Sequence, residues 1–204
     1  MSDKYLDKAY DARTSDETKV LYDKWSTSYD AEVAENGYAT PVRAADALAK
    51  LLTDKSAPVL DFGCGTGLFG EELNSRGFRT VDGVDLSPDM LAEAKDKGVY
   101  RDVWQIEAGA NLKTNPGDYA AIAAVGVIGV GAAPPETLDI MFAALATKGL
   151  MAFSLNDHAM ANAQFKGKVD DYLNNNLAIG RFYEYGDHLL GISLKSAIYI
   201  FEKR

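Results

Sequence analysis

VLDFGCGTG, residues 59–67, is the stretch of this sequence that decides its fold. It begins as an apolar strand, carries a carboxylate at Asp61, and then places glycine at alternate positions, Gly63, Gly65 and Gly67. Glycine allows a tight turn and lets the backbone approach a bound molecule closely. Because an amphipathic segment follows, the pattern predicts a strand, a glycine turn and a helix whose free N–H groups face the turn.

The rest of the chain alternates short apolar runs with amphipathic ones. This alternation predicts right-handed strand–helix–strand crossovers and a mainly parallel sheet. The run at 119–125 is almost wholly apolar, as expected of a strand buried on both faces. Strands are expected at 58–62, 80–85, 103–107, 119–125 and 150–155, and helices at 68–76, 88–97 and 135–146.

The two ends of the chain depart from this alternation. Helical spacing of apolar residues predicts helices around 20–29 and at 40–52. The second helix is expected to bury a stripe made by Val42, Ala45, Leu48 and Leu52. Beyond a polar helix expected at 159–177, two strands at 181–185 and 192–201, joined by a turn at Gly186-Asp187, predict an antiparallel edge of the sheet.

Length and composition indicate a globular protein. The chain has 204 residues, of which 47% are hydrophobic and 25% charged. No repeat or linker separates two domains. We therefore expect a single domain over 1–204, with a helical cover at 1–54 and a Rossmann-like core at 55–204.

The charge pattern disfavours several partners. A net charge of −9 and the lack of a Lys/Arg-rich run argue against nucleic acid. Residues 1–19 lack the apolar core of a secretory signal, and the apolar stretch at 119–135 is too interrupted to span a membrane. Cys64 is the only cysteine, and no ligand cluster has metal spacing. A cytoplasmic enzyme without a metal, membrane or nucleic-acid partner is expected.

A second carboxylate accompanies the glycine turn. Asp85 ends the next expected strand, in the run VDGVD at 81–85. In an open α/β sheet, ligands bind at the carboxyl ends of the strands, where such a carboxylate accepts hydrogen bonds from ribose hydroxyls. Asp61, beside the turn, would repel a pyrophosphate and attract an ammonium group. The GxGxG spacing also differs from the dinucleotide pattern GxGxxG. The pair favours S-adenosylmethionine over a dinucleotide.

Simpler explanations of the same residues stay open at this point. A structural turn without a ligand also explains the glycines. A helix N-cap also explains Asp85, although Ser87 suits that role better. Leu86 and Met90 are expected to flank an adenine ring, while core packing explains Met90 equally well.

The two motifs VLDFGCGTG and VDGVDLSPDMLAEA resemble motifs I and II of class I S-adenosylmethionine-dependent methyltransferases. The N-terminal stretch LYDKWSTSYDAEVAENGYATP further resembles the Williams-Beuren-region methyltransferase-like group. The resemblance covers residues 20–204. It implies a Rossmann-like seven-stranded sheet in the order 3-2-1-4-5-7-6, with strand 7 antiparallel, under N-terminal cover helices.

The resemblance also implies further contacts to the donor. The loop after the third strand would face the adenine, with Asn111 where the family usually has an acidic residue. Gly126 and Val127 would offer backbone carbonyls to the ammonium group. The cofactor-binding residues expected are Asp61, Gly63, Cys64, Gly65, Gly67, Asp85, Leu86, Met90, Ala110, Asn111, Leu112, Gly126, Val127, Tyr22 and Tyr29.

Catalytic residues are less evident. Methyl transfer from a sulfonium is an in-line displacement, so the protein mainly aligns the acceptor and excludes water. His158, after the fifth strand, and Tyr29 are the candidates, although a surface loop also explains His158. His188 is expected in the terminal turn without a role. Cys64 has no histidine partner in its motif, and a small side chain between glycines explains it.

An aromatic set in the N-terminal segment suits a cover over the active site. Aromatic faces enclose a sulfonium through cation–π contact, although packing of a helix on the sheet explains the same residues. The set consists of Tyr22, Trp25, Tyr29 and Tyr38.

The sequence therefore predicts S-adenosylmethionine-dependent methyl transfer to a small molecule whose identity it does not give. Two other functions stay open: a protein that binds S-adenosylmethionine or S-adenosylhomocysteine without turnover, and an NAD(P)-dependent oxidoreductase. The oligomeric state is not indicated.

Overall fold

The computed structural model describes Tyr5 and residues 15–204; residues 1–4 and 6–14 of the predicted cover lie outside the described residues. Its strands are β1 (Val59–Phe62), β2 (Val81–Asp85), β3 (Asp102–Gln105), β4 (Ala121–Ala124), β5 (Leu150–Asn156), β6 (Ala178–Leu189) and β7 (Leu194–Lys203). Its helices are α2 (Ser15–Glu35), α3 (Thr40–Leu51), α4 (Leu68–Ser75), α5 (Pro88–Asp96), α6 (Thr137–Ala144), α7 (Asp157–Ala161) and α8 (Ala163–Asn174), with a short 3₁₀ turn at Leu190–Ile192.

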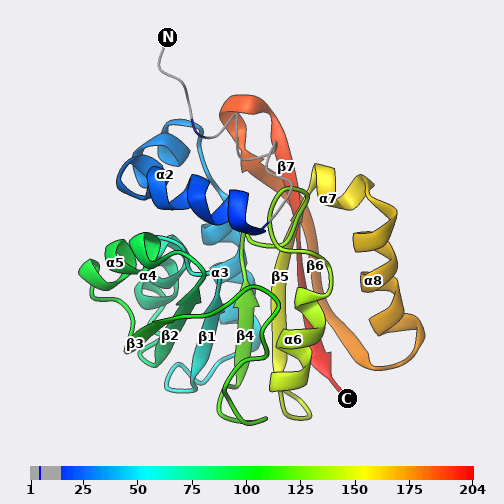
Figure 1. Cartoon of the computed structure of the whole chain (residues 1–204). Coiled ribbons are helices and arrows are strands. Elements are labelled where there is room, and N and C mark those ends of the chain that lie inside the picture. The colour runs from blue at the N-terminus through cyan, green and yellow to red at the C-terminus, as the bar shows by residue number, and fades with distance from the viewer. Residues whose placement is uncertain (1–4, 6–14) are drawn as a thin grey trace.

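The strands form one sheet in the order β3-β2-β1-β4-β5-β7-β6 (Figure 1). β7 runs antiparallel to both of its neighbours, and the remaining pairs are parallel. The predicted fold class and strand order are confirmed. The parallel strands β1, β2 and β4 end on the same side of the molecule, and the glycine turn follows the carboxyl end of β1 there.

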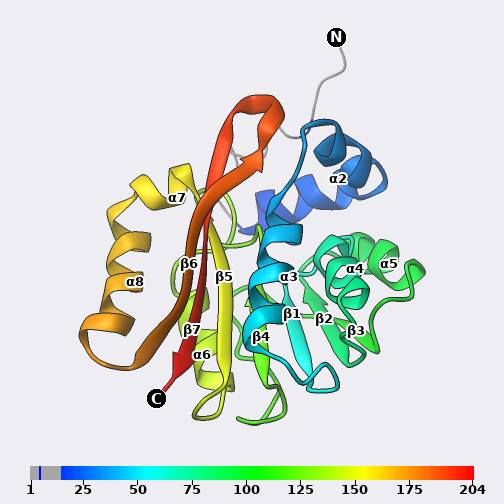
Figure 2. The ribbon, with the colours of Figure 1, turned by 180° about the vertical axis from the view of Figure 1, so that it is seen from behind.

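Each face of the sheet has its own core, because successive side chains of a strand point to opposite faces. In β4, Ala121 and Ala123 pack with α3 and α4, while Ile122 and Ala124 pack with α6 and α8. Figures 1 and 2 show α6 and α8 on one side of the sheet and α3 on the other. A strand buried on both faces explains why β4 is apolar throughout.

The N-terminal helices form in the predicted segment, but with a different buried face. α2 lies across the carboxyl ends of the parallel strands (Figure 1). α3 buries small residues, Ala44, Ala45 and Ala47, around Leu48, whereas Val42 is 41% exposed. The expected stripe through Val42 was therefore wrong. A face of alanines suits the close packing of α3 on the sheet.

The C-terminal segment needs two corrections. The expected helix at 159–177 is two helices, α7 and α8, because the side chain of Asn162 accepts a hydrogen bond from the Gln164 N–H and caps a new helix. The expected turn at Gly186-Asp187 is part of β6, and the chain reverses at the 3₁₀ turn instead. Gly186 makes room for the Arg43 guanidinium, which would lie 3.0 Å from a Cβ at this position.

Among the described residues, no helix is both long and apolar enough to cross a membrane.

Gly70, in α4, tests how tightly the sheet and its helices pack. A Cβ at Gly70 would lie 2.3 Å from Cζ of Tyr100. Alanine gains about 1 kcal/mol over glycine in a helix, but overpacking a buried site costs about 1–3 kcal/mol. We expect Gly70→Ala to lower the free energy of unfolding in urea titrations.

Gly167, in α8, is the matched control. A Cβ there meets no atom within 4 Å, so Gly167→Ala should stabilise the protein by about 0.5–1 kcal/mol. Equal shifts in both variants would contradict the packing described for Tyr100.

Candidate functional site

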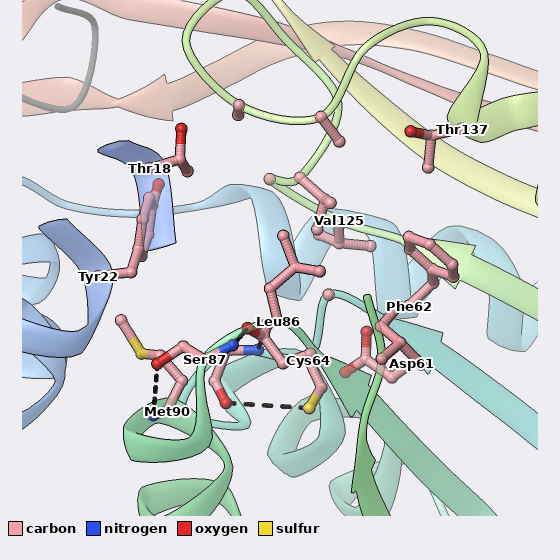
Figure 3. Close-up of a pocket in the computed structure, with 18 of the residues that line it drawn as sticks. Thr18, Tyr22, Asp61, Phe62, Cys64, Leu86, Ser87, Met90, Val125 and Thr137 are labelled. Atoms are coloured by element: carbon pink, nitrogen blue, oxygen red, sulfur yellow. Dashed lines mark hydrogen bonds between the residues drawn. The ribbon is translucent and has the colours of Figure 1, made fainter. Parts of the chain in front are cut away.

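A cavity of about 340 Å³ lies at the carboxyl ends of β1, β2 and β4, with α2 as its cover (Figure 3). It brings together residues from the cover, the glycine turn and the loops after β2, β3 and β4. Of the residues predicted from the sequence, the cavity is lined by Tyr22, Tyr29, Asp61, Gly63, Cys64, Gly65, Asp85, Leu86, Met90, Gly126 and Val127.

The glycine turn is tied to the neighbouring strands. The N–H groups of Gly63 and Cys64 both donate to the carbonyl of Val84, over 2.7 and 2.9 Å. Gly63 has a φ of +74°, and a Cβ there would lie 2.5 Å from a methyl of Val127. Only glycine meets both constraints, so the turn passes directly against the loop after β4.

Asp85 closes the turn from the β2 side. One of its carboxylate oxygens accepts from the Gly65 N–H and the other from the Ser87 N–H, each over 2.9 Å. An ionised carboxylate oxygen has two lone pairs, so each oxygen keeps capacity for one more donor. Burial raises the pKa of Asp85, although the hydrogen bonds from Ser87 and Gly65 oppose that shift.

Asp61 is the most enclosed charged group of the site. Its side chain is 1% exposed, and its Oδ2 accepts a hydrogen bond of 2.7 Å from the Tyr100 hydroxyl. Burial raises the pKa of Asp61 to about 7; the Tyr100 hydrogen bond opposes this shift and the charge of Asp85 adds to it. A buried carboxylate with this pKa is stabilised in its charged form by a cation in the cavity.

Ser87 fulfils its predicted role as the N-cap of α5, since its Oγ accepts from the Met90 N–H over 3.1 Å (Figure 3). The same hydroxyl donates to Asp23 of α2. Further along α2, Asp30 accepts a hydrogen bond of 2.5 Å from the hydroxyl of Thr66 in the glycine turn. The cover is therefore hydrogen-bonded to the glycine turn after β1 and to the loop after β2.

Five of the predicted cofactor-binding and catalytic candidates do not line the cavity. Gly67 is the N-cap of α4 and packs against Tyr100 and Lys97. Leu112 belongs to the core on the α6 side of the sheet. The others that do not contact the cavity are the half-buried Ala110 and the exposed Asn111 and His158.

The loop after β3 presents Glu107, Ala108 and Gly109 to the cavity instead of residues 110–112. The chain turns at Gly109, which has a φ of +70°, and the Ala110 N–H donates to the Glu107 carbonyl. Residues 110–112 therefore do not line the cavity, and their expected contact with the adenine stays a prediction. Glu107, two residues after the end of β3, is an acidic residue of this loop that lines the cavity and that the sequence analysis did not single out.

The two residues after β4 that were expected to offer backbone carbonyls, Gly126 and Val127, make different hydrogen bonds. The carbonyl of Val127 already accepts from the Ala133 N–H over 3.0 Å, within its own loop. The Gly126 N–H donates a hydrogen bond of 2.7 Å to the hydroxyl of Ser154. Both residues line the cavity, close to the Tyr38 hydroxyl, which would lie 2.0 Å from a Cβ at Gly126.

The sheet order and the cavity at the carboxyl ends of its parallel strands define a protein with a Rossmann-like fold. Comparison with known proteins agrees. Residues 37–186 match the family described as methyltransferase domain. The chain belongs to this family, and its resemblance to class I S-adenosylmethionine-dependent methyltransferases is confirmed.

Among curated proteins, the chain is 38% identical over 159 residues to human methyltransferase-like protein 27, covering 76% of this chain and 63% of the relative. It is 40% identical over 75 residues to the bovine 18S rRNA (guanine-N(7))-methyltransferase, covering 37% of this chain and 26% of that protein. The chain thus spans less than two thirds of the length of either relative.

Among solved structures, magnesium protoporphyrin IX methyltransferase from Synechocystis, with bound S-adenosylhomocysteine, superposes with a TM-score of 0.65. The match covers 91% of this chain and 99% of that one at 14% identity, which shows a shared fold.

Cys64 offers a test of the enclosed geometry of the turn. It is 6% exposed, and burial raises the pKa of its thiol well above the usual value, with the charges of Asp61 and Asp85 adding to the shift. Since the thiolate is the reactive form, we expect slow reaction with a disulfide reagent at pH 7 and release of one thiol per chain in urea. Reaction of the native protein as fast as that of the unfolded one would contradict this geometry.

Proposed function

We propose that this protein transfers the methyl group of S-adenosylmethionine to a small molecule. The observation that carries the proposal is the pair of carboxylates, Asp61 and Asp85, at the ends of adjacent parallel strands beside a glycine turn. A dinucleotide pyrophosphate in this place would meet two negative groups. The ammonium and the ribose hydroxyls of S-adenosylmethionine satisfy both.

The residues are assigned along the donor as follows. Asp61 faces the ammonium group, and the Gly63–Gly65 backbone supports the methionine end. The two oxygens of Asp85 accept from the ribose hydroxyls in addition to their backbone donors. Leu86 and Met90 flank the adenine. Glu107, in place of Asn111, accepts from the adenine amino group, because it lines the cavity and Asn111 does not.

The cover completes the site on the side of the sulfonium. Tyr22 and Tyr29 line the cavity from α2, and their ring centroids lie 6.1 Å apart. Aromatic faces at this place stabilise the sulfonium through its positive charge. In the reaction the acceptor's lone pair forms a bond to the methyl carbon, and the electrons of the broken bond return to sulfur, giving S-adenosylhomocysteine. A proton carried by the acceptor leaves to water.

A small acceptor suits the way the cavity is closed. α2 is hydrogen-bonded to the turn and to the loop after β2, so an acceptor must fit beneath it. The net charge of −9 disfavours a polyanion. The bovine relative that is named for rRNA matches only 37% of this chain, so its substrate does not transfer by similarity.

Methyl release from labelled S-adenosylmethionine tests the function directly. A metabolite panel and ribosomal RNA are offered as acceptors in parallel. We expect transfer to small molecules. Transfer to RNA alone would contradict the proposed acceptor class, and donor binding without transfer to any acceptor would indicate a protein that only binds the donor.

Asp85→Ala tests the ribose site. The substitution removes hydrogen bonds worth about 1–3 kcal/mol, so the affinity for S-adenosylhomocysteine, measured by calorimetry, should fall by that amount. Asp89→Ala, an exposed change in the first turn of α5, is the control and should leave affinity unchanged. Unchanged affinity in Asp85→Ala would contradict the assignment.

Tyr100→Phe tests the charge of Asp61. Because Asp61 binds the ammonium group in its ionised form, donor affinity should rise as the pH increases through about 7. The Tyr100 hydrogen bond lowers the pKa of Asp61, so its loss should move the midpoint of this rise to higher pH. Calorimetric titrations of both proteins with S-adenosylhomocysteine between pH 6 and 8.5, in buffers matched for ionic strength, measure the two midpoints; equal midpoints would refute the role.

A further inference from the structure

A second, smaller cavity of about 60 Å³ adjoins the first. The two share part of their walls, namely Tyr22, Tyr29, Tyr38, Gly126, Val127 and Ala132. At roughly 10–15 Å³ for each water-sized position, the second cavity holds about four to six such positions, so a ring bound there would also occupy part of the adjoining first cavity. Tyr22 and Tyr29, assigned above to the sulfonium side of the donor, lie between the two spaces.

The walls of the second cavity carry no charge. Among the described residues, no Asp, Glu, Lys or Arg lines it. His188 does line it, and its Nδ1 lies 2.7 Å from the hydroxyl of Thr40. Burial, with the nearby charge of Arg43, lowers the pKa of His188 to about 4, so the ring is neutral at physiological pH. A charged ligand would lose its hydration here without gaining a counter-charge.

The same walls are rich in aromatic rings. Trp25 packs edge-on against Tyr29 with centroids 4.7 Å apart, and Tyr22 lies 5.6 Å from Trp25. Tyr38 packs edge-on against His188 at 5.2 Å. Faces and edges of rings at these separations favour a flat, apolar ligand.

Trp25 also carries an unmet hydrogen-bond donor. Its side chain is 1% exposed and lines the second cavity. Within the part of the chain that the structure describes, its Nε1 is one of only two buried side-chain nitrogen or oxygen atoms without a partner; the other, Thr114 Oγ1, does not line this cavity. Buried donors are almost always paired, and an unpaired one is stabilised by any ligand that brings an acceptor atom.

We propose that the second cavity is the acceptor subsite and that it takes an uncharged, planar ring compound whose oxygen or nitrogen accepts a hydrogen bond from Trp25 Nε1. This assignment rests on the proposed methyl transfer. It reverses the sequence-based expectation for His188, which lies in β6 as a neutral wall of the subsite rather than in a terminal turn. Because the two cavities adjoin along the residues they share, a ring in the second cavity would lie next to the methyl group of a donor in the first.

Nuclear magnetic resonance of the indole N–H groups tests the proposal on the intact chain. The protein has two tryptophans, Trp25 and Trp104, and Trp104→Phe assigns the two signals. Phenol, an uncharged ring with an oxygen acceptor, is titrated into protein saturated with S-adenosylhomocysteine. We expect a saturable downfield shift of the Trp25 signal and no shift of the Trp104 signal.

Matched probes define the chemistry of the subsite. Toluene lacks the acceptor atom and should bind about tenfold more weakly than phenol, the ratio expected for one hydrogen bond to a buried donor. Benzoate and benzylammonium, which carry opposite charges, should bind more weakly still. Trp25→Phe should remove the preference for phenol over toluene, whereas Trp104→Phe should keep the preference.

Two failures are distinguishable in this design. If S-adenosylhomocysteine does not bind, the proposed function fails. If it binds but phenol leaves the Trp25 signal unmoved, or if a charged probe binds as well as phenol, the acceptor subsite is overturned and the donor site stands. Should Trp25→Phe fail to fold, the titration of the unaltered protein still decides the question.

Discussion

The site depends on one hydrogen bond between two buried groups, the Tyr100 hydroxyl and the Asp61 carboxylate at the end of β1. A carboxylate that is 1% exposed is costly to ionise, and the negative charge of Asp85 adds to that cost. Tyr100 reaches it because Gly70 has no side chain to block the ring. The fold thus holds a carboxyl group with a pKa of about 7 next to the glycine turn, and a bound cation would favour its ionised form.

The same region of the protein links the donor site to its cover. Asp30 of α2 bonds Thr66 in the glycine turn and pairs with Lys97 at the end of α5, over 2.7 Å. Asp23 accepts from Ser87, whose backbone N–H bonds Asp85. The aromatic face of α2 is therefore positioned by the loops that directly follow β1 and β2, the strands that carry the two carboxylates. In the proposed arrangement, the walls of the acceptor subsite therefore depend on these contacts of α2.

Much of this architecture could be predicted from local patterns. The glycine spacing, the carboxylate at Asp85 and the apolar run of β4 can each be read from one short segment of sequence. In the structure, the three segments form or follow adjacent strands of the sheet. The expected contact of Asn111 with the adenine stays a prediction, because a turn at Gly109 decides which residues of the loop line the cavity, and single-sequence periodicity does not show that turn. The sequence predicted a turn at Gly186, whereas this glycine lies in β6 and makes room for Arg43. The two residues are distant in the chain, so the sequence does not show their contact. The roles of Tyr100 and His188 likewise depend on tertiary contacts.

The most direct measurement follows the carboxyl carbon of Asp61 by ¹³C nuclear magnetic resonance, assigned with Asp61→Asn, across pH 5–9 with and without saturating S-adenosylhomocysteine. This ligand keeps the ammonium group and lacks the reactive methyl. We expect a midpoint of about 7 in the free protein. We also expect a fall of about 1–3 units when the ammonium binds beside the carboxylate. A midpoint that the ligand leaves unchanged, or a carboxylate already ionised at pH 5 in the free protein, would contradict the proposed role of Asp61.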